Sequence, residues 1–259
     1  MTALLGSLLF AVVYVGGSSE LLRQMMGQPS GQELGAHMVE LARQSLGRPY
    51  RSFSLDTGPE QLQIDLTAFD CFLFVEQLLA LARESTRSAF ENRVRHLRYR
   101  GGFVDYCHRQ HYFSLWSQQA EASNVLRDIT PELPGAQRRQ RQLNYMSTHS
   151  SSYRPLRNKR NLLCIQTLEK NLIVHQSYIP LERLPAVEPM LRDGDIFALV
   201  TSVPGLDVTH VGLVEREQNR VHGLHAAPRG GVVRSRDLNR YASGVADVIG
   251  VSFHRPLKP

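Results

Sequence analysis

Cys71 is the residue of this chain best placed for nucleophilic chemistry. Asp70 precedes it, and an apolar run from Phe72 to Ala82 follows it. Because aspartate is a favoured N-cap, this pattern predicts a helix with Cys71 in its first turn. Unsatisfied N–H groups and the positive end of the helix dipole would favour the thiolate there, which is the reactive form of cysteine. A buried, unreactive cysteine on a core helix is the alternative.

A cysteine nucleophile needs a base within hydrogen-bond reach and a third group that orients the base. Among the ten histidines, His210 and His225 fall in two apolar segments that predict a β-hairpin. With the turn centred on Glu217-Gln218, the numbers of paired residues sum to 435, and His210 lies opposite His225, with Cβ atoms about 5 Å apart. With the turn centred on Gln218-Asn219, His225 pairs with Gly212 instead. Both registers place the two imidazoles on one face of the hairpin.

We therefore predict that His210 is the base for Cys71 and that His225 orients His210. Two alternatives are surface histidines on an ordinary hairpin and a zinc site. The zinc ligands would be Cys71, His210 and His225, or the Cys107-His108-x-x-His111 segment. Neither set contains a paired CxxC or a zinc-protease helix motif, so we expect no metal and no other cofactor.

The sequence predicts mainly helices in the first half of the chain and strands in the last part, and these elements must position the candidate residues. This order is an α+β pattern. Residues 33–46 predict a helix that stops at Gly47, residues 51–69 an extended connection, and the helix at Cys71 is expected to run to about Arg87. An aromatic-rich middle follows. Strands are predicted after Asp193-Gly194-Asp195, at 196–200, 208–214, 221–224, 232–233 and 248–253.

The composition of the 259 residues is that of a globular protein, with 42% hydrophobic and 21% charged residues. Part of the net charge of +6 comes from two basic clusters, Arg138 to Arg141 and Arg154 to Arg160. We expect these clusters to be solvated loops; weak attraction to an acidic surface or substrate is the functional alternative. No nucleic-acid motif accompanies them, so no nucleic-acid partner is expected.

The N-terminal segment from Ala3 to Val15 is almost wholly apolar and is followed by small residues. It is too short for a membrane span and fits the core of a secretory signal, although no basic residue precedes it. We expect a signal peptide or an anchor over residues 1–20 and one domain over residues 30–259. A truncated signal and a buried first helix are the alternatives. Three cysteines are too few for a disulfide scaffold: Cys107 and Cys164 either pair or are two unrelated buried thiols.

The chemistry-bearing segments resemble the NlpC-type papain-like cysteine hydrolases of bacterial cell walls, and within them the N-acetylmuramoyl-L-alanine amidase-like branch. The likeness runs from about Glu33 to Pro256. The segments that carry it are Gly47-Arg48-Pro49-Tyr50, Phe69-Asp70-Cys71-Phe72-Leu73-Phe74-Val75-Glu76, residues 109–116, Asp128-Ile129-Thr130, Asp193-Gly194-Asp195, Gly205-Leu206-Asp207-Val208-Thr209-His210-Val211-Gly212 and His225-Ala226.

The resemblance implies a nucleophile at Cys71, a base at His210, an orienting residue at His225 and a tyrosine, Tyr50, that helps to bind the oxyanion. It also implies a papain-like fold in which the nucleophile helix packs on an antiparallel sheet, with an inserted helical and loop middle segment. Within that middle segment the resemblance suggests four candidates for binding the sugar or the peptide of the substrate: Arg109, His111, Tyr112 and Trp116. Core packing is the alternative for Tyr112 and Trp116.

The expected function is hydrolysis of the amide between the muramic lactyl group and L-alanine in peptidoglycan fragments, with anhydro-muropeptides as the preferred substrates. An endopeptidase that cuts the stem between D-glutamate and the diamino acid is the runner-up. A catalytically silent wall-binding module and acyl transfer to an amine or alcohol are further alternatives. The expected location is the periplasm or another exported compartment, with the cytoplasm as the alternative, and no stable membrane span is expected.

Overall fold

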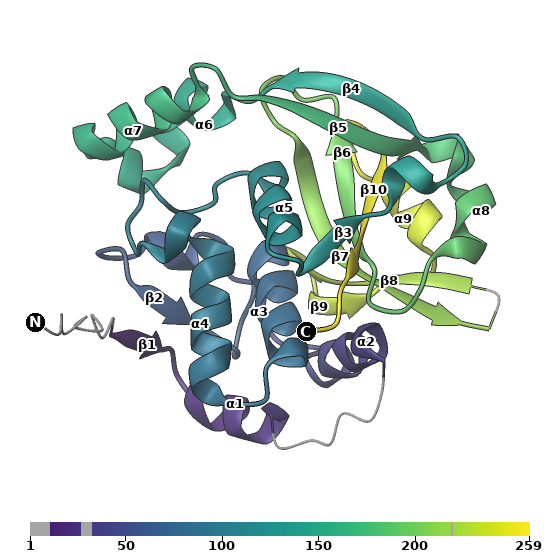
Figure 1. Ribbon diagram of the computed structural model, residues 1–259, viewed down its shortest axis with the longest axis horizontal. Coiled ribbons are helices and arrows are strands. Elements are labelled where there is room, and N and C mark those ends of the chain that lie inside the picture. Colours follow the sequence, from purple (N-terminus) through teal and green to yellow (C-terminus); the bar gives the residue numbers. More distant parts are fainter. Residues whose placement is uncertain (1–10, 27–32, 219) are drawn as a thin grey trace, which may run out of the picture.

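The computed structural model describes residues 11–26, 33–218 and 220–259. It is a mixed α/β molecule with one large antiparallel sheet (Figure 1). The described α-helices are α1 (Ser18–Met26), α2 (Leu34–Gln44), α3 (Cys71–Arg83), α4 (Arg87–Arg98), α5 (Phe113–Ala122), α6 (Tyr145–Thr148), α7 (Lys159–Glu169), α8 (Leu184–Val187) and α9 (Leu238–Ser243). The described strands are β1 (Val12–Tyr14), β2 (Leu62–Ile64), β3 (Leu126–Asp128), β4 (Gln137–Gln142), β5 (Ile173–Pro180), β6 (Ile196–Thr201), β7 (Val208–Glu217), β8 (Arg220–Ala227), β9 (Gly231–Arg234) and β10 (Val248–Pro256).

The large sheet has the order β4-β5-β10-β6-β7-β8-β9, and β3 also pairs with β10. All of its pairings are antiparallel, and the last strand, β10, lies between β5 and β6. The coarse expectation of helices combined with an antiparallel sheet is therefore confirmed. The five strands predicted from the apolar segments after residue 193 correspond to β6 through β10.

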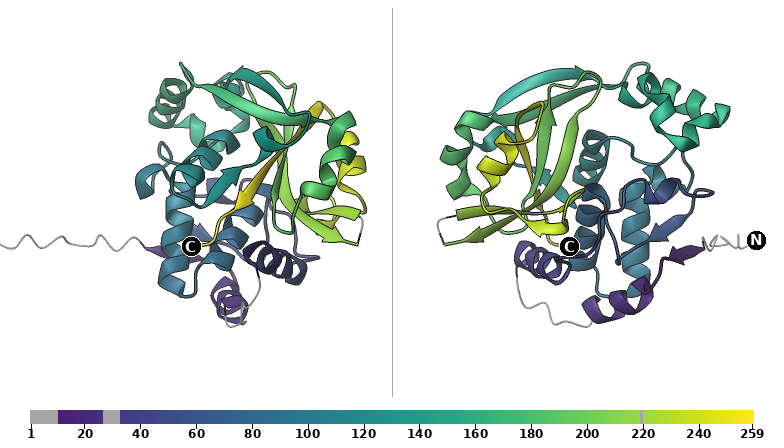
Figure 2. Two further views of the ribbon diagram at one scale, coloured as in Figure 1. Left: turned by 45° about the vertical axis from the view of Figure 1, so that its right-hand side comes forward. Right: turned by 180° about the vertical axis from the view of Figure 1, so that it is seen from behind.

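Both faces of the sheet are covered. Strand β6 is buried along its whole length, and its side chains alternate between two apolar clusters. Ile196 and Ala198 face the cluster that contains α1 to α5, whereas Phe197 and Leu199 face the cluster that contains α8 and α9. Figure 2 shows α8 and α9 beyond the sheet, away from the longer helices. A strand with both faces buried reads as the continuous apolar run seen in the sequence.

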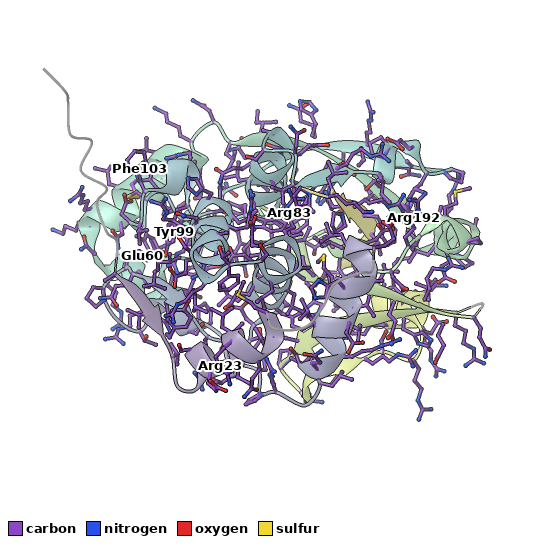
Figure 3. All side chains as sticks on the ribbon, turned by 60° about the horizontal axis from the view of Figure 1, so that its bottom comes forward. Arg23, Glu60, Arg83, Tyr99, Phe103 and Arg192 are labelled. Atoms are coloured by element: carbon purple, nitrogen blue, oxygen red, sulfur yellow. A yellow bond between two sulfur atoms is a disulfide. The ribbon has the colours of Figure 1, made fainter. Side chains whose placement is uncertain are left out.

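Helix α3 is the central helix and packs against α2, α4, β7 and β8. It ends at Arg83, four residues before the expected end, because Thr86 caps a separate helix, α4, by accepting a hydrogen bond from the backbone N–H of Ala89. A buried ion pair joins the two helices, with Arg98 Nη2 2.6 Å from Glu76 Oε1. Tyr99, directly after α4, donates its hydroxyl proton to Glu60, and the two side chains lie together in Figure 3.

The N-terminal expectation falls partly outside the described residues, because residues 1–10 are not described. Residues 12–14 form β1, which pairs in parallel with β2, and α1 begins at Ser18. Ser18 is fully buried, and its hydroxyl accepts a hydrogen bond from the backbone N–H of Leu66. Leu22 and Met25 of α1 belong to the main core. Residues 12–26 therefore pack against the rest of the chain, and the division into a signal or anchor over residues 1–20 and a domain over residues 30–259 stays a prediction.

The first basic cluster is a strand rather than the expected loop. Residues 137–142, which include Arg138 to Arg141, form β4 at the edge of the sheet and pair with β5 along their whole length. Arg139 donates a hydrogen bond to the carbonyl oxygen of Thr201 at 2.8 Å, so this arginine stabilises the fold. Strand β4 contains only polar residues, so it lacks the alternation of apolar and polar residues by which a strand is predicted from sequence. Charged residues are typical of strands at the edge of a sheet.

The middle of the chain forms a smaller apolar cluster around α6 and α7. A disulfide between Cys107 and Cys164 ties α7 to the segment before α5, which decides between the two alternatives left open for these cysteines. Cys71 is the free cysteine. Within the described residues, no helix combines the length and the apolar composition needed to cross a bilayer.

Candidate active site

The nucleophile candidate stands where the sequence predicts. Helix α3 begins at Cys71, and the Asp70 carboxylate accepts a hydrogen bond from the backbone N–H of Leu73 at 2.7 Å. This cap fixes the first turn of α3 and so the direction of the Cys71 side chain.

The ionisation of Cys71 differs from the expectation of a ready thiolate. Loss of hydration raises the pKa of the Cys71 thiol to about 12, and the neighbouring Asp70 carboxyl adds to the rise. Backbone N–H groups of Val211, Cys71 and Phe72 oppose this shift but do not overcome it. The N-terminus of α3 favours the thiolate, but the loss of hydration on burial disfavours the thiolate by more. The resting side chain is therefore a neutral thiol.

The two histidines are in contact. Their ring planes are perpendicular, and His210 Nε2 lies 2.9 Å from His225 Nδ1. The paired residues of β7 and β8 have numbers that sum to 437, for example Leu213 and Leu224, so the second of the two predicted registers is the correct one. The prediction that both imidazoles share one face of the hairpin is confirmed.

Both imidazoles are neutral at ordinary pH. Burial lowers the pKa of His210 to about 3, with the neighbouring His225 contributing, and it lowers the pKa of His225 to about 4. Because His225 Nδ1 occupies His210 Nε2, the remaining ring nitrogen of His210 is Nδ1.

Close packing holds the histidine pair in place. A Cβ built on Gly212 would lie 2.5 Å from the Phe197 ring and 2.8 Å from His225 Cβ, so only glycine fits between them. The Tyr241 ring of α9 lies against His225, with ring centroids 4.3 Å apart and planes tilted by 31°. No motif marks Tyr241, because its helix is separated from β8 along the chain by another strand.

Cys71, His210 and Tyr50 line one cavity of about 470 Å³. Tyr50 is held there by a bridge to Phe69, just before the cap of α3. Burial raises the pKa of Tyr50 to about 12, and the proximity of Cys71 and Asp70 contributes. Tyr50 therefore keeps its hydroxyl proton and is a hydrogen-bond donor at neutral pH. The cavity can hold a nucleophile, a base and a donor around one carbonyl group.

The family comparison gives this geometry a context. A sequence profile described as AmiA-like, N-acetylmuramoyl-L-alanine amidase-like, matches residues 40–247. The chain belongs to this family. A search of curated proteins finds no match to this amidase-like chain.

Solved structures agree with the family. One crystal structure of an N-acetylmuramoyl-L-alanine amidase from Bacteroides uniformis ATCC 8492 is 30% identical in sequence to the amidase-like chain, with a TM-score of 0.82, and covers 88% of it and 100% of the solved chain. A Bacteroides fragilis protein with the provisional name of xylanase is 31% identical over 83% of this chain and 99% of the solved chain, with a TM-score of 0.78. A Legionella pneumophila protein shares the fold at 20% identity and a TM-score of 0.77, over 94% of this chain and 96% of that one.

Two of the four residues that were predicted to bind substrate in this amidase-like chain line the cavity that contains Cys71. Arg109 lines it and donates to Asp56 at 2.6 Å, and His111 lines it with its Nε2 2.7 Å from the carbonyl oxygen of Tyr106. That carbonyl can only accept, so His111 carries its proton on Nε2. Burial and the nearby Arg109 lower the pKa of His111 to about 3.

The other two predicted residues are in the core of the amidase-like fold. Tyr112 is 2% exposed and donates its hydroxyl proton to Glu169 at 2.5 Å. Trp116 is 1% exposed and packs edge-on against Phe72, with ring centroids 5.3 Å apart. Neither lines the cavity, so the placement agrees with the alternative of core packing.

Several residues that line the cavity of the amidase-like chain were not predicted from the sequence. Phe53, 55% exposed, and Tyr153 form an aromatic rim, with ring centroids 6.1 Å apart. Asp56 and Tyr106 surround Arg109. Only the fold brings these segments together, and none carries a motif.

In the zinc alternative that uses Cys107, His108 and His111, Cys107 is not available as a ligand, because its sulfur is bonded to that of Cys164. His108 Nδ1 lies 2.6 Å from Asp105, and His111 faces Tyr106. Among the described residues, no three histidine, cysteine, aspartate or glutamate side chains are grouped to hold a metal ion.

Proposed function

We propose that this protein hydrolyses the amide between the muramic lactyl group and L-alanine in peptidoglycan fragments, with Cys71 as the nucleophile. The observation that carries the proposal is that Cys71 and His210 line one cavity and that His210 contacts His225 behind it, in a chain of the amidase-like family. Binding alone requires no such trio, which argues against a silent wall-binding module.

Proton transfer starts from neutral partners. For His210 to accept the thiol proton on Nδ1, its Nε2 must carry a hydrogen and donate it to His225 Nδ1. His225 then holds its own proton on Nε2, so the contact selects one tautomer for each ring. Because the thiol pKa is far above that of His210, the proton stays on sulfur in the resting site and moves to His210 only as sulfur bonds to the substrate carbonyl.

The remaining steps return every group to its starting form. The tetrahedral intermediate collapses, the C–N bond breaks, and His210 gives its proton to the departing nitrogen of L-alanine. Water, deprotonated by His210, attacks the thioester and releases the lactyl carboxylate while Cys71 regains its proton. The Tyr50 hydroxyl and the Cys71 backbone N–H are suited to bind the oxyanion, since both are donors beside the sulfur.

The cavity has the features of a site for a sugar-peptide ligand. The aromatic rim of Phe53 and Tyr153 offers an apolar wall for a sugar ring, while Arg109 and His111 provide polar contacts. The family name directs the proposal to muramoyl peptides, and the resemblance of the sequence favours anhydro-muropeptides among them.

We also propose that the fold is of the NlpC papain-like type. In support, a helix opened by Cys71 packs on an antiparallel sheet whose β7 carries His210. Export to the periplasm or another oxidising compartment is supported by the disulfide, which is rare in cytosolic proteins.

Product analysis tests this function. Wild-type protein is incubated with N-acetylmuramoyl-L-alanyl-D-glutamyl peptides, their anhydro forms and xylan, and the fragments are identified by mass. We expect intact peptide with a free N-terminal alanine and no products from xylan. Cleavage inside the stem would identify the endopeptidase instead, and transfer of the muramoyl group to an added amine would identify an acyltransferase.

A further inference from the structure

A second cavity, of about 580 Å³, lies next to the one that holds Cys71. The two cavities share Asp56 and Tyr106 in their walls. The proposed reaction uses only the first cavity, so the second has no role in it. Its volume is within the range of sites that bind small ligands.

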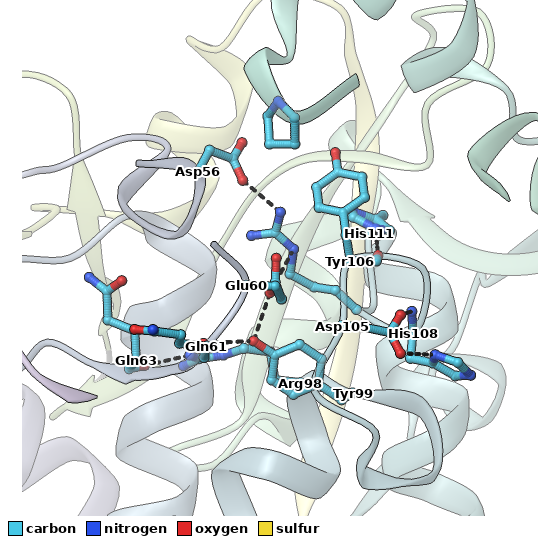
Figure 4. Close-up of polar contacts among 12 residues, drawn as sticks. Asp56, Glu60, Gln61, Gln63, Arg98, Tyr99, Asp105, Tyr106, His108 and His111 are labelled. Atoms are coloured by element: carbon cyan, nitrogen blue, oxygen red, sulfur yellow. Dashed lines mark hydrogen bonds and ion pairs between the residues drawn. The ribbon is translucent and has the colours of Figure 1, made fainter. Parts of the chain in front are cut away.

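Arg109 lines the first cavity and contacts Asp56 and Tyr106, the two residues that both cavities share and that are labelled in Figure 4. Its guanidinium donates to Asp56 at 2.6 Å, and its Nε lies 3.6 Å from Glu60 Oε1. The same guanidinium lies 4.7 Å from the centre of the Tyr106 ring. These contacts fix Asp56, Glu60 and Tyr106 relative to one another, so a ligand in the second cavity would hold a defined position relative to Cys71.

Two buried polar atoms at this wall form no hydrogen bond with the described residues, and Nε of Arg109 has only its 3.6 Å ion-pair contact with Glu60. Tyr106 is 5% exposed, and its hydroxyl makes no hydrogen bond within the described part of the chain. Nε of Arg109, whose side chain is 9% exposed, is likewise without a hydrogen bond. Buried polar groups nearly always have a hydrogen-bond partner, and leaving one without it is unfavourable. An unpartnered hydroxyl at the junction of two cavities indicates a ligand that crosses from one to the other.

The second cavity presents charges of both signs. Glu60 accepts a hydrogen bond from Tyr99 on Oε1, and its Oε2 accepts none from the described residues. Arg154 and Arg160 also line this cavity, are exposed, and form no ion pair within the described ranges. Arg160 belongs to the first turn of α7, where the helix dipole adds to the attraction for an anion.

We propose that the second cavity binds the far end of the stem peptide, a residue that carries an ammonium group beside a carboxylate. This inference rests on the proposed function, which places the amide to be cleaved at Cys71. Glu60 receives the ammonium group, and Arg154 and Arg160 receive the carboxylate. The Tyr106 hydroxyl donates to the peptide backbone where it passes between the cavities. A diamino acid at the third stem position has this chemistry, whereas the first two stem residues, alanine and glutamate, do not supply a side-chain ammonium.

Calorimetric binding to the Cys71→Ala variant tests this site, because the variant cannot consume the ligand. The probes are N-acetylmuramoyl-dipeptide, N-acetylmuramoyl-tripeptide ending in diaminopimelate, and the same tripeptide with its side-chain amine acetylated. We expect acetylation to weaken tripeptide binding about tenfold, as for loss of one charge-assisted hydrogen bond. Glu60→Gln should weaken the unmodified tripeptide by a similar factor and have no further effect on the acetylated one.

Arg154→Ala supplies a variant on the surface that does not threaten folding, and it should weaken both tripeptides but not the dipeptide. Arg157→Ala, an exposed arginine of the same turn that does not line the cavity, is the matched control and should change no affinity. Equal affinity for the free and acetylated tripeptides would overturn the proposal, as would equal loss for dipeptide and tripeptide in Glu60→Gln. Failure of wild-type protein to release peptide with a free N-terminal alanine from the muramoyl-tripeptide would refute the proposed function, whereas the binding measured with Cys71→Ala tests the second cavity separately.

Discussion

At the scale of single residues, the main correction concerns charge rather than position. The sequence correctly predicts that Cys71 opens a helix capped by Asp70, because capping depends on a few neighbouring residues. It does not predict the neutral thiol, because the burial that raises the thiol pKa depends on segments far away in sequence, such as β7, that pack on α3. Cys71 is thus a neutral thiol and His210 a neutral imidazole in the resting protein.

This ionisation predicts how alkylation of Cys71 depends on pH. Only the thiolate reacts with iodoacetamide, and the thiol pKa of about 12 keeps the thiolate fraction small. The rate should therefore rise about tenfold for each pH unit up to at least about pH 9. Mass spectrometry of the Cys71 peptide gives the rate, and Cys71→Ala is the control for other sites. A plateau near neutral pH would reveal a preformed ion pair and contradict this account.

At the scale of elements, apolar patterning explains which predictions succeeded. Strands β6 to β8 are apolar on one or both faces, so their positions were visible in the sequence. The charged strand β4 carried no such pattern. Helix α4 was missed although its signal was present, since Phe90, Val94 and Leu97 form a narrow stripe after the Thr86 cap. Hairpin register needed the structure, because both turn positions place the histidines on one face.

The packing of the hairpin makes Gly212 a sensitive position. Gly212→Ala would push a methyl group into the Phe197 ring and toward His225, both of which are buried. We expect a loss of about 1–3 kcal/mol in the free energy of unfolding and a fall in kcat, because His225 must shift. Chemical denaturation and steady-state kinetics measure the two effects. Gly17→Ala is the control, since a Cβ there meets no atom within 4 Å; equal behaviour of the two variants would count against the packing argument.

At the scale of the whole molecule, long-range connections were the least predictable. Three cysteines leave the pairing open in sequence, and only the fold brings Cys107 and Cys164 to a Cα separation of 5.8 Å. Residues 12–26, placed in a leader or before the domain by their composition, pack into the main core. The second cavity is likewise built from segments that are far apart along the chain.

The disulfide should stabilise the whole chain, because it closes a loop with a sequence separation of 57 residues. Replacing both cysteines, Cys107→Ser with Cys164→Ser, should lower the free energy of unfolding by about 2–4 kcal/mol. Urea denaturation of the double variant and the wild type gives the difference. Cys71→Ser breaks no covalent link and serves as the control. A double variant as stable as the wild type would show that this link adds nothing to the fold.

The central claim, that Cys71 cleaves the muramoyl–alanine amide, is tested most directly by one paired digest. Wild type and Cys71→Ala are incubated with the same anhydro-muropeptide, and the release of peptide with a free N-terminal alanine is followed by mass spectrometry. The account predicts steady release by the wild type and loss of at least about 10³-fold in rate for the variant. Release by Cys71→Ala at the wild-type rate, or cleavage deeper in the stem by the wild type, would contradict it.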